Sequence, residues 1–139
     1  MHKLSFYILS FTWGLPMTLL GGIVATGFIL NGYTLQKWGY CYYIEIGDHW
    51  GGCDLGLFFL KDKQTGMNTK NHEHGHAIQN IYWGLLMPFV IGIPSVIRYW
   101  FREYLVKVKK VSPSSLPDYD AIWFEHQATI LGTELVNNI

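Results

Sequence analysis

The chain has 139 residues, of which 50% are hydrophobic and 14% are charged, against roughly 25% charged residues in an ordinary soluble domain. This composition is typical of a membrane protein, and the length predicts one membrane-embedded domain over residues 1–139. The formal net charge of zero excludes nucleic acid as a partner. We therefore expect a mainly α membrane protein in contact with membrane lipid.

The first element is a long hydrophobic run without charged residues that follows Lys3. A membrane-spanning helix needs about 20 apolar residues, so the run predicts a transmembrane anchor over 4–33. A cleaved signal peptide is the alternative, because Ala25-Thr26-Gly27 resembles a processing site. Signal-peptide cores span only about 7 to 15 residues, which favours an uncleaved anchor. Gly14 and Pro16 are expected to bend this helix.

A small β-hairpin is expected next, over 39–61. Aromatic and branched residues in 40–46 and 54–60 predict two paired strands, with glycine and polar residues forming the turn between them. In this register Cys41 lies away from Cys53, and no disulfide is expected. The second strand leads towards the next motif and is a candidate for binding an extended peptide by strand addition.

The most informative motif is His72-Glu73-His74-Gly75-His76. On a helix, His72 and His76 stand one turn apart on one face and can hold a single Zn²⁺ through neutral imidazoles. Glu73 is then the candidate catalytic residue, a general base for a water molecule activated by the metal. His74 shares no face with the other two histidines and is expected to pack or to form a hydrogen bond. A polar segment that binds nothing is the alternative interpretation.

We expect the motif helix and the hydrophobic segment after it to cover 69–106. No proline interrupts Thr69 to Met87, so one helix can carry the whole motif. A serine- and proline-rich linker follows, and a C-terminal helix is predicted over 118–136. The predicted order is therefore an anchor, a hairpin, a motif helix with its hydrophobic continuation, and a C-terminal helix.

A third metal ligand is needed, because a catalytic zinc usually has three protein ligands and one open position. Glu125 lies among aromatic and apolar neighbours on the C-terminal helix. Burying an unpaired carboxylate costs several kcal/mol, so a metal is a suitable partner if that face is interior. His126 and Asp120 are weaker alternatives, and an exposed Glu125 that binds nothing remains open. For stabilising an oxyanion, only Tyr119 and His126 are candidates.

The hydrophobic segment 77–97 decides whether these ligands can meet. A single membrane crossing would place the histidines and Glu125 on opposite sides. Pro88 and Pro94 break the segment, so we expect two short helices that enter and return to the same side, which is allowed where protein covers the break. Re-entry leaves only Lys3 opposite the other nine Lys and Arg residues, a strong positive-inside asymmetry. We expect an integral membrane protein with its metal site at the cytoplasmic face.

The pattern His-Glu-x-Gly-His, followed by Glu-x-x-Ala at Glu125 to Ala128, resembles the gluzincin metallopeptidases. It is most similar to the membrane-embedded group that includes the CAAX prenyl proteases and the bacterial heat-shock membrane proteases. The resemblance implies His72, His76 and Glu125 as zinc ligands and Glu73 as the general base. One departure is Thr129, where that group usually has aspartate. A carboxylate that steadies a ligand histidine must then come from elsewhere or is missing.

The function expected from the sequence is that of an integral-membrane zinc metallopeptidase acting on a peptide or protein substrate near the membrane surface. The small size makes a membrane-protein partner or a homo-oligomer plausible. A non-catalytic membrane protein with a structural or sensing metal, or with none, is the alternative and needs no general base. A secreted or lipid-modified interaction module is a third reading, and it requires removal of the first helix.

Overall fold

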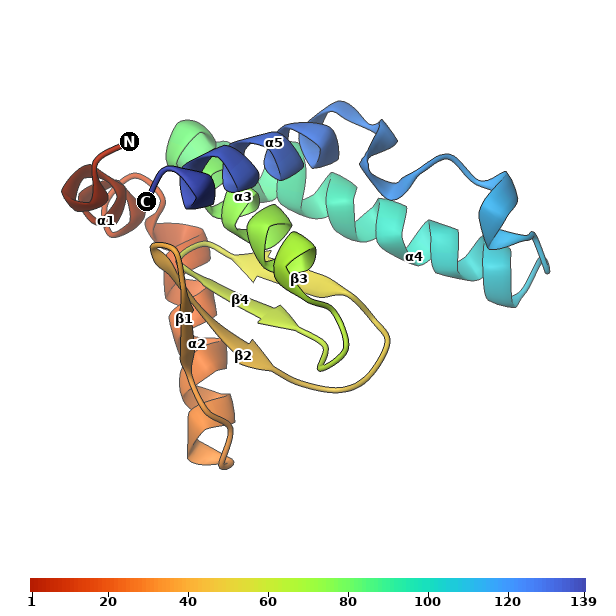
Figure 1. The fold of residues 1–139 in the computed structure, drawn as a ribbon, viewed down its shortest axis with the longest axis horizontal. Helices are drawn as coiled ribbons and strands as arrows, with labels where there is room; N and C mark the ends of the chain where they lie inside the picture. Colours follow the sequence, from red (N-terminus) through yellow and green to blue (C-terminus); the bar gives the residue numbers. More distant parts are fainter.

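The computed structural model describes all residues from Met1 to Ile139 and consists mostly of helices around a small four-stranded sheet (Figure 1). The helices are α1 (Lys3–Ser10), α2 (Leu15–Leu30), α3 (Met67–Trp83), α4 (Ile93–Lys107) and α5 (Trp123–Asn137), with short helical turns at Gly84–Leu86, Pro88–Gly92, Pro113–Ser115 and Tyr119–Ala121. The strands are β1 (Gln36–Trp38), β2 (Cys41–Glu45), β3 (Gly52–Leu55) and β4 (Phe58–Lys61). The mainly α class with a small β element is confirmed.

The first hydrophobic run forms two helices, so the prediction of one anchor helix over 4–33 is wrong. The chain bends by 86° between α1 and α2, a sharper break than a kink at Gly14 and Pro16. The bend is held from α3, since Asn80 Nδ2 donates to the carbonyl oxygen of Gly14 at 3.0 Å. A Cβ at Gly14 would lie only 2.6 Å from that Nδ2 atom, so glycine allows the close approach.

The helices were compared with the length and hydrophobicity that a membrane span requires. No single helix is both long enough and apolar enough to cross a membrane. Two pairs meet the length and composition criteria together: α1 with α2, and Met67–Leu86 with Pro88–Lys107, which are bent by 116°.

The sheet contains two hairpins rather than the single hairpin predicted over 39–61. Strand order is β1-β2-β4-β3, with β1 antiparallel to β2 and β3 antiparallel to β4. The two central strands, β2 and β4, are parallel, and Tyr42 is paired with Phe58. The prediction failed because 54–60 is not one strand. Gly56 adopts a positive φ of 74° and turns the chain between β3 and β4.

The main core lies between the sheet and α3. Phe59, Cys41 and Tyr43 from the sheet pack against Ala77 and Ile78 of α3, and all five are buried. Alternate side chains of a strand point to the same face, so Cys41 and Tyr43 of β2 both point towards α3. Cys41 lies on β2 and Cys53 on β3, with β4 between these strands.

The chain reverses after α3, as the two prolines predict. Helix α3 ends at Trp83, and a π-type turn over Pro88–Gly92 leads into α4. The chain bends by 116° between Met67–Leu86 and Pro88–Lys107, which brings α4 back past the motif helix α3 (Figure 1). The linker after α4 then leads into α5, which packs along α3. Two arginines of α4 fix that linker, since Arg98 donates to the carbonyl oxygens of Asp118 and Tyr119 and Arg102 donates to that of Pro117.

Helices α3 and α5 cross at glycines. A Cβ on Gly75 would collide with the backbone carbonyl of Ala128, and a Cβ on Gly132 would collide with that of Asn71. Gly75, the fourth residue of the histidine motif, therefore lets the two backbones touch. This contact places the side chain of Glu125 within reach of the motif histidines.

Asp62 ties the loop after β4 to the loop before β3. Its carboxylate accepts hydrogen bonds from the backbone N–H groups of Trp50, Gly51 and Thr65 at 2.8 to 2.9 Å, and from the Thr65 hydroxyl at 2.6 Å. Burial raises the pKa of Asp62, but these donors outweigh burial and hold the pKa well below its ordinary value. The ionised carboxylate therefore stabilises the fold.

We expect Asp62→Asn to lower the free energy of unfolding by about 2 kcal/mol near neutral pH, because an amide cannot satisfy all these donors. The stabilisation from the low pKa is complete above about pH 4, the pKa of an unfolded aspartate, and is lost as the pH falls further. The gap between wild type and variant should therefore shrink below pH 4. Thermal unfolding as a function of pH measures it, and a gap that stays constant down to pH 2 would contradict this account.

Candidate metal centre

The structure brings His72, His76 and Glu125 together. Their three ligand atoms lie within 4.8 Å of one another. Glu125 Oε2 is 2.9 Å from His72 Nε2 and 3.0 Å from His76 Nε2. The histidines come from successive turns of α3, and the carboxylate comes from the first turn of α5. These three residues therefore lie close enough to hold one metal ion.

The second ring nitrogen of His76 is fixed by Gln79. The Gln79 amide donates through Nε2 to the carbonyl oxygen of Phe124 at 2.8 Å and to Gln127 Oε1 at 2.9 Å. Its oxygen therefore faces His76 Nδ1, 2.7 Å away, and accepts a hydrogen bond from the N–H group there. This leaves Nε2 of His76 with a free lone pair towards Glu125.

His72 is oriented by Thr129. The Thr129 hydroxyl donates to the carbonyl oxygen of Glu125 at 3.3 Å, so it can accept from His72 Nδ1 at 2.8 Å. The residue that departs from the resembled pattern thus steadies a ligand histidine with a hydroxyl in place of a carboxylate. The expectation that such support comes from elsewhere or is missing is therefore corrected, since position 129 itself provides it.

These hydrogen bonds leave three lone-pair-bearing atoms facing one another, two imidazole Nε2 atoms and Glu125 Oε2. A metal ion placed between them could bind all three atoms. Two neutral imidazoles and one carboxylate form a donor set of the kind used by catalytic zinc.

Glu125 is held from two further directions. Its side chain is fully buried, and its second oxygen, Oε1, accepts a hydrogen bond from Ser95 Oγ at 2.7 Å. Ser95 belongs to the first turn of α4, so the returned helix reaches the centre directly. This bond leaves Oε2 as the oxygen that faces the two histidines.

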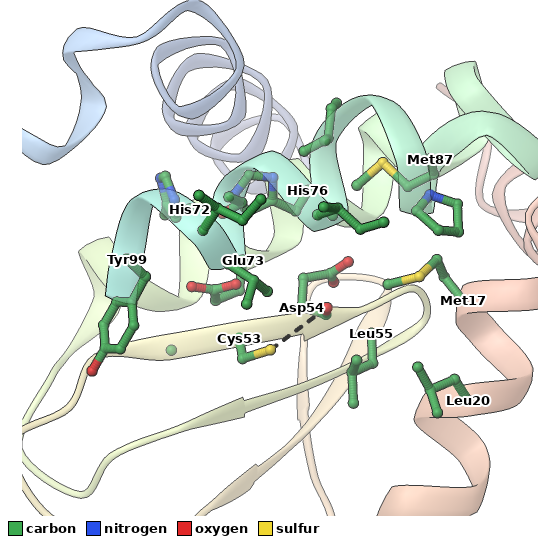
Figure 2. Close-up of a pocket in the computed structure, with 18 of the residues that line it drawn as sticks. Met17, Leu20, Cys53, Asp54, Leu55, His72, Glu73, His76, Met87 and Tyr99 are labelled. Atoms are coloured by element: carbon green, nitrogen blue, oxygen red, sulfur yellow. Dashed lines mark hydrogen bonds between the residues drawn. The ribbon is translucent and has the colours of Figure 1, made fainter. Parts of the chain in front are cut away.

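Glu73 points into a cavity beside the cluster (Figure 2). Its side chain is only 4% exposed, and burial raises its pKa to about 7 despite the opposing influence of His72. A carboxyl with such a pKa can take and return a proton near neutral pH. Gly52 on β3 leaves the space for it, since a Cβ there would lie 2.6 Å from Glu73 Oε1.

A second carboxyl, Asp54, lines the same cavity (Figure 2). It stands two residues after Gly52 on β3, so both positions face α3. Burial, and then the charge of Glu73, raise the pKa of Asp54 well above its ordinary value. One of its oxygens accepts from the N–H of Gly56 at 3.0 Å, and the other has no partner. Its surroundings therefore favour the protonated form of Asp54 more than water does.

We expect Gly52→Ala to displace the Glu73 carboxyl and to leave the cluster of His72, His76 and Glu125 intact, because the new methyl group can be accommodated only if that carboxyl moves. For a carboxyl that acts in catalysis, a displacement of about 1 Å can cost a hundredfold in rate. The metal content of the purified variant, and its rate in any hydrolysis assay to which the wild type responds, measure the two effects separately. Gly27→Ala is the matched control, because no atom lies within 4 Å of a Cβ there. Unchanged turnover in Gly52→Ala would show that Glu73 needs no such space.

Of the other site residues considered from the sequence, one lines the cavity and the rest lie outside it. Tyr119 lines the cavity, and its ring stacks edge-on to His72 with centroids 6.3 Å apart. His126 is exposed, and neither His126 nor Asp120 joins the cluster. His74 is buried as a packing residue, as expected, and its Nε2 accepts from the backbone N–H of Tyr40 at 2.9 Å.

Sequence reasoning missed three residues of the site. Gln79 follows His76 by three positions, a spacing that places both on one helix face, so this contact was detectable. Ser95 and Asp54 reach the site only through the returned helix α4 and the β3–β4 hairpin. No local pattern signals them.

Comparison with protein-family models, with curated proteins and with solved structures finds no match to this chain.

Proposed function

We propose that this protein is a membrane-bound zinc metallopeptidase. The observation that carries the proposal is the convergence of His72 Nε2, His76 Nε2 and Glu125 Oε2 beside a cavity into which Glu73 projects. Bound Zn²⁺ would polarise the scissile carbonyl and make a water molecule more acidic. A purely structural metal site would need neither the cavity nor a buried acid with a raised pKa.

Proton transfer is assigned to Glu73. Its carboxylate takes a proton from the attacking water and passes it to the leaving amine as the peptide bond breaks. The position of Glu73, which lines the cavity beside the cluster, supports both steps. Tyr119 also lines the cavity next to His72 and supplies a hydroxyl donor for the oxyanion.

Substrate main chain is assigned to the free edge of β3. This strand is at the edge of the sheet, and its four residues all line the cavity. An extended peptide can pair with unpaired N–H and C=O groups of such an edge. From the sequence, this role was expected of 54–60. Because Phe58–Lys61 forms β4 and lies inside the sheet, only Gly52–Leu55 can serve.

Membrane attachment is proposed from the two bent helix pairs and from exposed apolar surface. Helices α2 and α4 expose large apolar side chains that no part of the chain covers, among them Leu19, Ile23, Ile93, Ile97, Trp100 and Phe101. Lipid is the proposed partner of these surfaces, with 77–97 as the re-entrant part. The distribution of Lys and Arg residues favours a cytoplasmic metal site.

Metal dependence tests the function. Purified protein in detergent should contain about one zinc ion per chain and cleave members of an internally quenched peptide library. A strong chelator should abolish cleavage, and added Zn²⁺ should restore it. Zinc bound at unit stoichiometry with no hydrolysis of any library member would favour the non-catalytic alternative, and absence of metal binding would contradict the site itself.

A further inference from the structure

The cavity beside the metal centre has a volume of about 660 Å³ and an unusual distribution of charge. No lysine or arginine is among its lining residues. Its carboxyl and imidazole groups are those of Glu73, Asp54 and the two candidate ligand histidines. A substrate carboxylate therefore finds no lysine or arginine side chain to pair with in the cavity wall.

The nearest arginines are held elsewhere. Arg98 donates to the carbonyl oxygens of Asp118 and Tyr119, and its guanidinium lies 4.9 Å from the centroid of the Tyr119 ring. Arg102 donates to the carbonyl oxygen of Pro117. Both groups brace the linker before α5 and are absent from the cavity wall. Moving either one towards a substrate would break these bonds.

The walls and the rim of the cavity are apolar. Met17, Leu55, Met87 and Ile91 form buried or half-buried walls. The rim is made by residues that line the cavity and are also strongly exposed: Leu20 of α2, and Ile93, Val96, Ile97 and Trp100 of α4, which are 47% to 64% exposed. The rim on α2 and α4 is thus apolar, so a polypeptide entering between these helices first meets apolar side chains.

We infer that the cavity selects an uncharged, apolar stretch of polypeptide and that cleavage occurs within the chain, away from a free carboxyl terminus. The inference rests on the proposed peptidase function and names its substrate class. An unpaired carboxylate is unfavourable to bury, so an acidic side chain or a terminal carboxylate next to the scissile bond is rejected. Apolar side chains gain by leaving water.

Peptide binding to metal-free protein tests the inference independently of catalysis. Three fluorescent peptides of equal length are compared by polarisation: one with a Leu-Val-Phe centre, one with glutamate in the central position, and one ending in a free carboxylate just after the centre. The apolar peptide should bind at least about tenfold more tightly than the other two. Equal affinity for the glutamate peptide, or preference for the free carboxylate, would overturn the inference.

A charge introduced at the rim gives a matched comparison. Val96 is 53% exposed on the rim, so in detergent-solubilised protein a lysine there displaces no buried side chain. Val96→Lys should shift the affinity ratio towards the glutamate peptide by about tenfold. Phe101 is equally exposed on the same helix but does not line the cavity, so Phe101→Lys should leave the ratio unchanged. Equal shifts in both variants would contradict the proposal that peptides enter the cavity past the rim that includes Val96.

Cleavage of the same peptides by the zinc-loaded protein separates the two proposals. If the apolar peptide binds selectively and no peptide is cut, the cavity assignment stands and the peptidase function fails. If the glutamate peptide is bound and cut as readily as the apolar one, or residues are removed stepwise from the carboxyl end, the peptidase stands and the substrate class is wrong.

Discussion

Replacing Glu73 by glutamine should leave the zinc content at about one ion per chain and reduce peptide hydrolysis by about a hundredfold to ten-thousandfold. Glutamine has nearly the same shape as glutamate, so it fits the space that Gly52 leaves. It cannot take a proton from water at neutral pH. Glu73 lies outside the cluster formed by His72, His76 and Glu125, so the metal should remain.

The matched control is Glu134→Gln, an identical change on the exposed side of α5. Hydrolysis of a quenched peptide and metal analysis of the same preparations give both quantities. If Glu73→Gln retained full activity together with its zinc, the assigned mechanism would be wrong. If Glu73→Gln lost its zinc, Glu73 would be a ligand, and the general base would have to be sought elsewhere, with Asp54 as the other carboxyl that lines the cavity.

Replacing Glu125 should remove the metal. For Glu125→Ala we expect a loss of zinc affinity of well over a hundredfold, because changes to groups that only orient ligands already cost ten- to a hundredfold. Glu125→Gln keeps the volume of the side chain, and its amide can still accept from Ser95. It therefore distinguishes loss of a ligand from a packing defect in the fully buried site.

Competition with a chromogenic chelator measures the affinity of each Glu125 variant, and circular dichroism reports whether α5 is retained. Thr129→Val is a graded comparison, because it removes only the hydroxyl that orients His72, with an expected loss of about ten- to a hundredfold. Unchanged affinity in Glu125→Gln would overturn the third-ligand assignment. It would also remove the functional reason for the chain to turn back after α3.

The helical part of the site was predictable from the sequence, because histidines four residues apart share a helix face whatever surrounds them. The turn after α3 was indicated by Pro88 and Pro94, since proline breaks helical hydrogen bonding. The approach of Glu125 to the histidines was expected only if the chain reversed. The observed bend of 116° supplies that reversal.

The sheet was predicted poorly because its central pairing is not local. Strands β2 and β4 are parallel, and parallel partners must be joined by a connection that no turn signature marks. The first helix was predicted too long because hydropathy does not report where another helix makes contact. Asn80 of α3 supplies that contact at Gly14. Side-chain partners such as Ser95 likewise depend on tertiary placement.

The glycine contacts between α3 and α5 make metal binding and folding parts of one equilibrium. His72 and Glu125 are 53 positions apart, and an ion bound to both closes that long loop of chain, which an unfolded ensemble cannot do. At a free zinc concentration a hundred times the dissociation constant, such linkage stabilises the native state by about 2.7 kcal/mol. Zinc supply would then govern how long the protein survives in a cell as well as whether it is active.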